Sequence, residues 1–250
     1  MLSVDNLSKS FGGVAAIRNV TLDFPAESLT AIIGPNGAGK TTFFNLISGA
    51  VVPDDGRVLL DGVDLVGLSR PEIVRRGIAR AFQVANIFPS LTVEESLMVA
   101  VQAHHRRAGV IGRRFPLANS GKPAEEVMDM LGLVDKAGTL CANLSHGDQK
   151  LLDIALALVL EPRVLLLDEP TAGMGPEERW QMINKVHRLW ERKRITVIFI
   201  EHDMDIVFKI ARSIRVLCYG QVLAEGAPDE IRGNPEVVAA YLGTDPEAHP

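Results

Sequence analysis

The spacing of hydrophobic and polar residues along the chain predicts alternating strands and helices. Runs of consecutive apolar residues are typical of strands buried on both faces of a sheet, and they occupy residues 29–33, 164–167 and 196–200. Helical spacing of apolar residues is found at residues 41–48, 149–160, 176–193 and 204–211. Two segments that reverse direction at glycines predict hairpins, at residues 2–24 and 214–224. This alternation favours an α/β fold.

The middle of the chain, residues 84–143, has a different pattern. Residues 92–105 and 123–131 have helical spacing. Residues 106–122 are rich in Arg, Gly and Pro, and therefore predict a loop. We expect this part of the chain to form a helical lobe inserted into the α/β core.

Composition and charge narrow the class of protein. The chain has 250 residues, enough for one large domain or two small lobes, and its net charge of -5 does not favour nucleic acid as the main partner. The most apolar stretch, residues 151–167, is interrupted by Asp, Glu, Pro and Arg, and the first residues lack a secretory pattern. Cys141 and Cys218 have no metal-ligand spacing. We expect a soluble, cytoplasmic domain.

One segment matches the phosphate-binding pattern G-x-x-x-x-G-K-[ST] in full. It consists of Gly34, Pro35, Asn36, Gly37, Ala38, Gly39, Lys40 and Thr41. The glycines allow successive backbone N–H groups to point at phosphate oxygens, and the helix that follows adds its positive end. We expect Lys40 to reach the β- and γ-phosphates and the Thr41 hydroxyl to bind Mg²⁺. A chance glycine turn before a helix is the alternative, and it leaves the full pattern unexplained.

Polar residues follow the last two of the buried runs. Asp168 and Glu169 follow residues 164–167, and His202 follows residues 196–200. An acidic pair is most often a loop start or a helix cap. In a chain with a phosphate loop, however, we expect Asp168 to hold Mg²⁺ and Glu169 to orient the attacking water or accept its proton. We expect His202 to contact the γ-phosphate, because such sheets bind ligands at the carboxyl ends of their strands.

The residues named above and four further features occur in a fixed order along the chain. In this order they resemble an ATP-binding cassette (ABC) ATPase over essentially the whole chain. The four further features are Phe11, Gln83, Leu-Ser-His-Gly-Asp at 144–148 and the segment 172–176. The resemblance implies a single ABC ATPase domain with a P-loop NTPase (RecA-like) core and an antiparallel β subdomain, at residues 1–83 and 150–243. A helical subdomain would be inserted at 84–149, and residues 244–250 would form a tail. ATP and Mg²⁺ are the implied cofactors.

The resemblance also assigns roles to single residues. Phe11 matches the aromatic residue that stacks on adenine, and Thr42 would help to bind the α-phosphate. Gln83 matches the glutamine that reaches Mg²⁺ and the attacking water. Glu169 matches the catalytic base, and His202 matches the switch histidine.

The signature segment of the family usually has the sequence Leu-Ser-Gly-Gly-Gln, and this chain departs from it. Ser145 and Gly147 survive, and in this family they would close over ATP held by a second cassette. His146 and Asp148 replace the third and fifth residues. We expect Asp148 to point away from the γ-phosphate and to act as a helix cap. Gly175 stands where the family commonly has Asp, which puts communication between the two ATP sites in doubt.

The C-terminal segment, residues 225–243, resembles the tail of ATP-binding subunits of bacterial branched-chain (hydrophobic) amino acid importers. Urea and short-chain amide importers share this tail, and the sequence Leu-Ser-His-Gly at 144–147 favours these importers as the alternative. The implied partners are a second cassette, identical or paralogous, and two transmembrane permease subunits that dock near residues 84–91. A periplasmic solute-binding protein would act indirectly, and the chain would lie peripherally on the cytoplasmic face of the inner membrane.

Two other classes of function remain as alternatives. The first is a soluble ABC ATPase that acts on DNA or ribosomes, which usually carries two cassettes or a long coiled coil. The second is a regulatory cassette that binds ATP without hydrolysing it. The single cassette, the negative charge and the full set of expected catalytic residues favour the importer.

Overall fold

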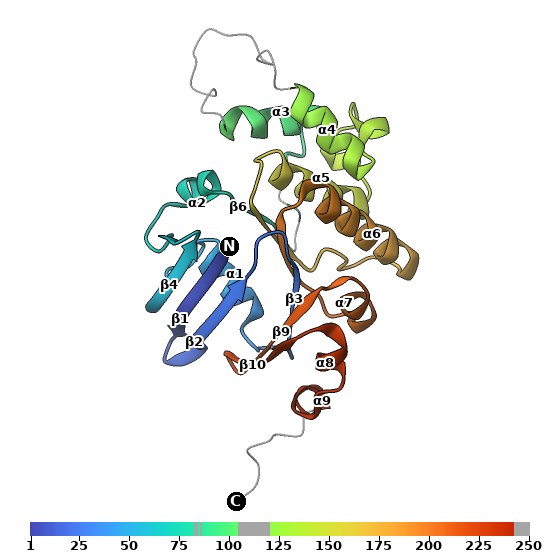
Figure 1. Ribbon diagram of the computed structural model, residues 1–250. Helices are drawn as coiled ribbons and strands as arrows, with labels where there is room; N and C mark the ends of the chain where they lie inside the picture. Colours follow the sequence, from blue (N-terminus) through green and yellow to red (C-terminus); the bar gives the residue numbers. More distant parts are fainter. Residues whose placement is uncertain (83–84, 86, 105–120, 243–250) are drawn as a thin grey trace, which may run out of the picture. The chain divides into compact units, whose positions relative to one another are not determined.

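The computed structural model describes residues 1–82, 85, 87–104 and 121–242. The chain forms two compact units, which are described separately below. The first comprises residues 1–76 with the chain from residue 195 onward, and the second comprises residues 77–194. Figure 1 labels most of the helices and strands of both units.

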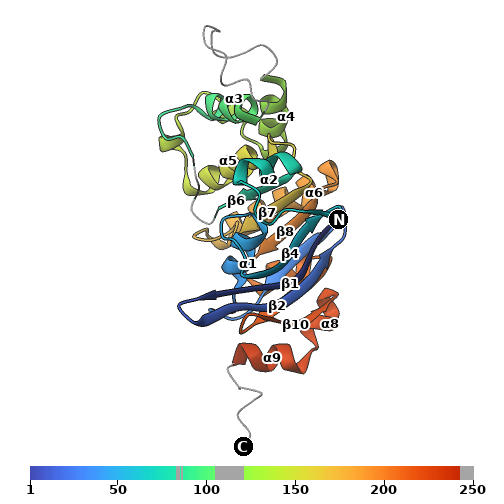
Figure 2. The ribbon, with the colours of Figure 1, turned by 90° about the vertical axis from the view of Figure 1, so that its left-hand side faces the viewer.

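The first unit contains an antiparallel sheet of four strands, with the order β2-β1-β4-β5. Its strands are β1 (Leu2–Phe11), β2 (Val14–Phe24), β4 (Asp55–Leu60) and β5 (Val63–Asp64). Gly12 and Gly13 both have positive φ, +55° and +84°, as the expected two-residue hairpin turn requires. The β1, β2 and β4 strands lie side by side in Figure 2. One face of this sheet is buried, since Leu2, Val4 and Leu22 are almost fully covered.

The same unit contains a mainly parallel set of strands. The β3 strand (Leu29–Ile33) pairs in parallel with β8 (Thr196–Ile200) and β9 (Ser213–Cys218), and β9 forms an antiparallel hairpin with β10 (Gln221–Gly226). All five residues of β3 and of β8 are buried, as their apolar runs predicted. The helices of this unit are α1 (Lys40–Ile47), α2 (Arg70–Arg76), α7 (Met204–Ile210), α8 (Pro228–Arg232) and α9 (Pro235–Leu242).

The second unit combines two parallel strands with helices. The β6 strand (Ile78–Ala81) pairs with β7 (Val164–Asp168) in the register Ile78 to Val164. The α-helices are α3 (Val93–His104), α4 (Gly121–Leu131), α5 (His146–Leu158) and α6 (Pro176–Lys193). Two 3₁₀ turns are also present, η1 (Val134–Lys136) and η2 (Cys141–Asn143). The α3, α4 and α5 helices pack against one another, which agrees with the expected helical lobe.

The expected fold class, an α/β core with an antiparallel β part and a helical part, is confirmed. The bounds of α6 and β8 match the sequence prediction, whereas α5 begins three residues earlier than expected. The predicted loop at 106–122 is wrong at its end, because Gly121 and Lys122 belong to α4; residues 106–120 lie outside the described part of the chain. The sequence predicted none of the elements between residues 55 and 81. The expected domain boundaries stay predictions.

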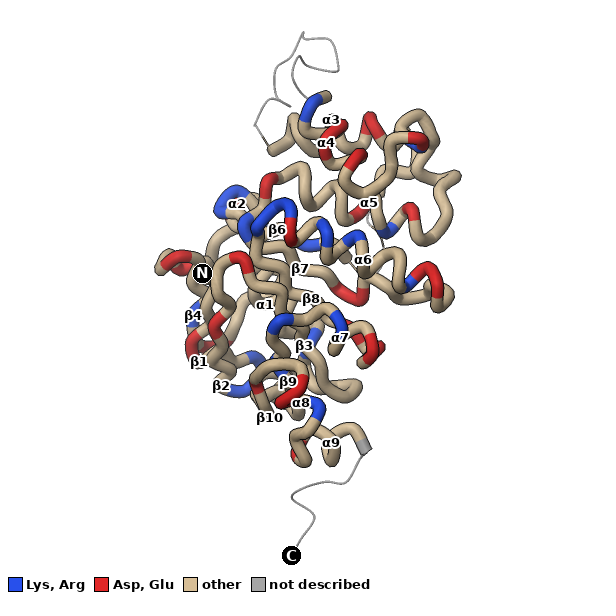
Figure 3. Tube along the Cα trace, turned by 45° about the vertical axis from the view of Figure 1, so that its right-hand side comes forward, with Lys and Arg blue, Asp and Glu red and all other residues tan. Residues whose placement is uncertain are grey.

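Within the described residues, no helix is both long enough and apolar enough to span a membrane. Lysine, arginine and acidic residues are interspersed along the elements of each unit (Figure 3).

Candidate functional site

The phosphate-binding segment connects β3 to α1, and only glycine fits at two of its positions. Gly34 has φ +151° and Gly39 has φ +99°. A Cβ atom would lie 2.0 Å from the Leu217 carbonyl oxygen at Gly34, and 2.5 Å from the Ala16 carbonyl oxygen at Gly39. The loop therefore lies directly against the backbone of β2 and β9, where a side chain at either glycine would clash.

Lys40 begins α1 and points back into the loop. Its side chain is buried, and Nζ donates hydrogen bonds to the carbonyl oxygens of Gly34, at 2.7 Å, and Pro35, at 3.0 Å. The N-cap residue, Gly39, supplies no side-chain cap, and uncapped N–H groups at a helix N-terminus are available to bind anions. Thr41 is exposed at the same helix end. A cation, a helix N-terminus and a hydroxyl thus meet at one loop.

Phe43 shows how α1 is anchored beneath this loop. It is fully buried, and its ring lies 6.2 Å from the ring of Phe24 on β2, measured between centroids. The phosphate loop is therefore supported from below by an aromatic pair in the core of the first unit.

Phe11 lies at the end of the first hairpin and is half exposed. Lys9 Nζ lies 5.6 Å from the centroid of its ring, within the range of a cation–π contact. An exposed aromatic face beside a lysine suits stacking on a nucleotide base. The role of Phe11 stays a prediction.

The segment after β8 places its successive polar residues in different environments. His202 is exposed, whereas its neighbour Glu201 is buried. Asp203 is the N-cap of α7 and accepts hydrogen bonds from the amides of Asp205, at 3.2 Å, and Ile206, at 3.4 Å. The local role of Asp203 is thus to begin the helix that follows His202.

The C-terminal helix α9 approaches the phosphate loop within the first unit. Burial raises the pKa of Tyr241 to about 12, although a hydrogen bond from the backbone of Gly34 acts in the opposite direction. The sequence hypothesis treated the tail only as a family feature and missed this contact.

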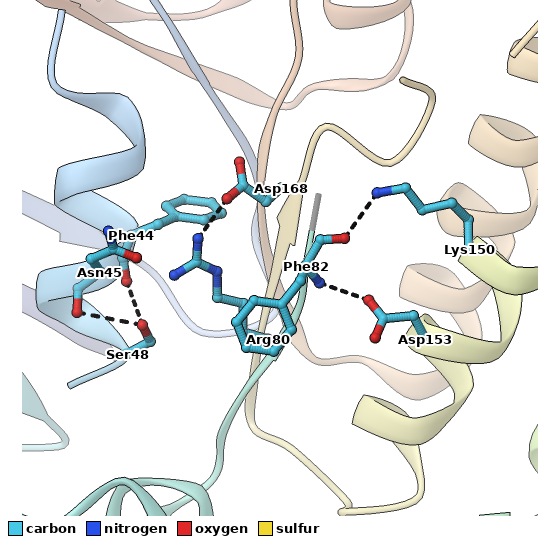
Figure 4. Close-up of polar contacts among 8 residues, drawn as sticks. All are labelled: Phe44, Asn45, Ser48, Arg80, Phe82, Lys150, Asp153 and Asp168. Atoms are coloured by element: carbon cyan, nitrogen blue, oxygen red, sulfur yellow. Dashed lines mark hydrogen bonds and ion pairs between the residues drawn. The ribbon is translucent and has the colours of Figure 1, made fainter. Parts of the chain in front are cut away.

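In the second unit, Asp168 ends β7 as predicted and is buried. Its Oδ2 atom lies 2.5 Å from a guanidinium nitrogen of Arg80 on β6, a partner that the sequence analysis missed (Figure 4). Glu169 follows with φ +48°, a left-handed conformation that non-glycine residues rarely adopt and that is common at functional sites.

Gln83 lies outside the described residues, but the residue before it is firmly held. The Phe82 amide donates a 2.7 Å hydrogen bond to Asp153, and the Phe82 carbonyl accepts a 2.8 Å hydrogen bond from Lys150 (Figure 4). Lys150 and Asp153 are both buried residues of α5. The helix that begins at the signature segment therefore fixes both backbone groups of Phe82.

Within the signature segment, Ser145 is the N-cap of α5. Its Oγ accepts a 3.2 Å hydrogen bond from the Asp148 amide and donates a 2.6 Å hydrogen bond to the Asp148 carboxylate. The sequence predicted Asp148 as the cap, and this was wrong, because the structure gives that place to Ser145. The carboxylate of Asp148 is instead paired with Lys136.

The environment of Asp148 keeps it ionised. Burial raises its pKa, but the hydrogen bonds from Lys136 and Ser145 outweigh burial, so the net pKa lies below its ordinary value. The residue borders a pocket of about 110 Å³ that is also lined by Ser145, Gly147, Met174 and Lys185.

His146 and the segment after Glu169 contact each other within the second unit. His146 Nε2 lies 3.2 Å from the Ala172 carbonyl oxygen. A Cβ atom on Gly173, which has φ +77°, would lie 3.1 Å from the same nitrogen. The altered third signature position is therefore packed against the segment that leads to Gly175.

We expect Asp148→Asn to leave the ATPase rate nearly unchanged, because Lys136 already balances the carboxylate within the second unit. The same variant should change how stability depends on pH. The pKa of Asp148 in the folded state lies below its value of about 3.9 in the unfolded state, so the ionised carboxylate stabilises the folded protein above about pH 3.9. This stabilisation is lost as the pH falls through the folded-state pKa. The difference in Tm between the wild type and the variant should therefore shrink on acidification. A large change in the ATPase rate would instead show that the Asp148 charge is felt at the nucleotide.

The phosphate loop on β3 and α1, and the buried carboxylate that ends β7, define the class as a P-loop ATPase. The ABC transporter family model matches residues 17–172, and the model for branched-chain amino acid ATP-binding cassette transporters matches residues 221–247. The chain belongs to the ABC transporter family, and it is an ATPase of that family.

Individual relatives agree with this assignment. The high-affinity branched-chain amino acid transport ATP-binding protein LivG of Escherichia coli (strain K12) is 38% identical over 97% of this chain and 98% of its own length. The ADP conformation of MJ1267, an ATP-binding cassette of an ABC transporter, is 30% identical with a TM-score of 0.84, covering 97% of this chain and 98% of that one. The dimeric post-hydrolysis state of the cassette MJ0796, bound to ADP and Pi, is 27% identical with a TM-score of 0.77, covering 91% and 99%.

These findings confirm the ABC ATPase assignment and a nucleotide-binding domain. The urea or short-chain amide alternative is not favoured, because the model that matches the tail and the relative LivG both carry the branched-chain amino acid name. The roles assigned to single residues, from Phe11 to His202, stay predictions.

Proposed function

We propose that this chain is the ATP-hydrolysing subunit of an importer for branched-chain amino acids. The observation that carries the proposal is the C-terminal segment, where the branched-chain model matches residues 221–247, beyond the residues of the general cassette match. The near full-length similarity to LivG supports it. In the first unit this segment forms β10, α8 and α9, and Tyr241 joins it to the backbone of Gly34 in the phosphate loop.

The proposed phosphate chemistry follows from the loop. Lys40 Nζ is held by two carbonyl oxygens, which are neutral acceptors. The β- and γ-phosphates of ATP would offer the same ammonium group stronger, charged acceptors. The N–H groups at the start of α1, which have no side-chain cap, and the side chain of Thr42 would bind the remaining phosphate oxygens. Binding therefore requires mainly a change of partner at Lys40.

The side chains proposed for magnesium fit that ion. The carboxylate of Asp168 and the exposed hydroxyl of Thr41 both offer hard oxygen atoms, which are the ligands that Mg²⁺ prefers. The Asp168 carboxylate already lies beside a cation, the Arg80 guanidinium group. Among the described residues, no group of three or more His, Cys, Asp or Glu could hold a metal. Magnesium uses few protein ligands, together with substrate phosphates and water. When bound, the ion would offset the charge that develops on the phosphates.

The proposed hydrolysis uses three side chains of this chain. Glu169 would accept the proton of the attacking water or orient it, and Gln83 would help to position that water. His202 is exposed beyond β8 and would contact the γ-phosphate.

The proposed assembly is a pair of cassettes on two membrane subunits. Ser145 and Gly147 line an open pocket and would close over ATP held by the second cassette, which is identical or paralogous. The dimeric form of the related cassette MJ0796 supports pairing. Phe88 is 44% exposed and would contact the permease subunits at the cytoplasmic face of the inner membrane. A periplasmic solute-binding protein would deliver the amino acid.

Uptake by the native organism tests the proposed solute. Deletion of the gene should abolish most high-affinity uptake of labelled leucine, and expression of the wild-type chain should restore it. Uptake of labelled urea, measured in the same cells, should not change. Loss of urea uptake with normal leucine uptake would overturn the proposed solute, while leaving the ATPase assignment intact.

A further inference from the structure

The Asp168 carboxylate already has a cationic partner within the second unit. In the parallel register of β6 and β7, Arg80 pairs with Leu166, and Asp168 lies two residues further along β7. Residues two apart on a strand share one face of the sheet, so the side chains of Arg80 and Asp168 extend on the same face. The guanidinium Nη2 lies 2.5 Å from Asp168 Oδ2 (Figure 4).

Burial makes this ion pair more than a surface contact. The side chains of Arg80 and Asp168 are 7% and 4% exposed. A carboxylate at that depth is strongly disfavoured without a compensating charge, and guanidinium is the cation best suited to buried carboxylates. Arg80 therefore supplies the positive charge that lies against the Asp168 carboxylate in this buried setting.

Other contacts hold the guanidinium group in place. Its central carbon lies 5.2 Å from the centroid of the Phe82 ring, which is a cation–π distance. Phe82 is itself fixed by Asp153 and Lys150 of α5, through both of its backbone groups. Arg80 thus occupies a defined position between the acidic end of β7 and the residue that precedes Gln83.

We propose that Arg80 is the resident counter-cation of Asp168, and that magnesium competes with it for this carboxylate when ATP binds. The inference rests on the proposed metal role of Asp168. Arg80 is then a positioning residue for the ATPase reaction, because its guanidinium group holds the Asp168 carboxylate and so sets the concentration at which magnesium binds. Since Arg80 also contacts Phe82, displacement of its guanidinium group would be felt at α5 and at the segment of Gln83.

Magnesium dependence of nucleotide binding tests the proposal without turnover. A fluorescent, non-hydrolysable ATP analogue is titrated into wild type, Arg80→Gln and Arg80→Lys, once in chelator and once over a series of magnesium concentrations. In Arg80→Gln the magnesium concentration for half-saturation should fall about tenfold, equivalent to about 1.4 kcal/mol. Affinity for the analogue in chelator should also fall, because the uncompensated Asp168 carboxylate would repel phosphate. Arg80→Lys keeps the charge without the planar fork and should shift half-saturation in the same direction by less.

Two further variants make the result decisive. Arg57→Gln is the matched control, because it breaks an exposed arginine–aspartate pair, 3.1 Å long, and should change neither quantity. Asp168→Asn tests the metal role itself and should remove most of the magnesium dependence. Suppose that Asp168→Asn loses its magnesium dependence, while folded Arg80→Gln and Arg80→Lys keep the half-saturating magnesium concentration of the wild type. The proposed competition between Arg80 and magnesium is then refuted. If Asp168→Asn retains the wild-type magnesium dependence, the metal role of Asp168 fails instead. Should Arg80→Gln not fold, Arg80→Lys alone decides, and an unchanged half-saturation refutes the proposal.

Discussion

Glu169→Gln is expected to retain ATP binding and to lose most turnover. The substitution keeps the size of the side chain and a polar oxygen, but an amide cannot accept the proton of the attacking water. General-base catalysis typically contributes about 10²–10⁴-fold, so the rate should fall at least about a hundredfold. ATP that is bound but not cleaved should also hold two cassettes together. Steady-state phosphate release gives the rate, and size-exclusion chromatography in ATP detects the trapped dimer.

Glu161→Gln is a matched control for this variant. Glu161 is an exposed glutamate with φ +50°, close to the +48° of Glu169, so the two substitutions have similar backbone consequences. The control should hydrolyse ATP at the wild-type rate. Near-normal hydrolysis by Glu169→Gln would refute Glu169 as the base.

Lys40→Ala is expected to abolish tight nucleotide binding. The substitution removes the one lysine of the phosphate loop, whose ammonium group is held at the Gly34 and Pro35 carbonyl oxygens. Hydrogen bonds to charged groups are worth about 1.5–3 kcal/mol each, so loss of contacts to two phosphates should weaken ATP binding by at least about a hundredfold. Isothermal titration with ATP and magnesium measures the affinity.

The exposed lysine Lys122 on α4 provides the control, and Lys122→Ala should bind ATP like the wild type. Circular dichroism should show that Lys40→Ala remains folded. Unchanged affinity in folded Lys40→Ala would count against the phosphate assignment of this loop.

The helices and strands that could be predicted from sequence are those whose spacing of apolar and polar residues fits only one type of secondary structure. The apolar runs of β3 and β8 are buried on both faces, and α6 begins at Pro176 with glutamates in its first turn. The elements between residues 55 and 81 were missed because their signals are weak. The β4 strand mixes exposed and buried residues, and β6 carries an arginine within four residues.

The polar partners of the site depend on tertiary contacts that no local pattern contains. Arg80 is tolerated in a buried strand because Asp168, 88 residues away, offsets its charge. The serine cap of α5 did have a local signal, since Ser145 with Asp148 three residues later resembles a capping box. Ser145 therefore serves as a helix cap in addition to occupying the second position of the signature segment.

The initial rate of labelled leucine uptake tests the central claim most directly, when the deletion strain expresses either wild type or Glu169→Gln at equal levels. The claim is that ATP hydrolysis by this chain drives import of branched-chain amino acids. Wild type should restore leucine uptake, whereas Glu169→Gln should assemble with the membrane subunits and leave uptake at the level of the deletion strain. Restoration of leucine uptake by Glu169→Gln, or failure of the wild type to restore it, would contradict the claim.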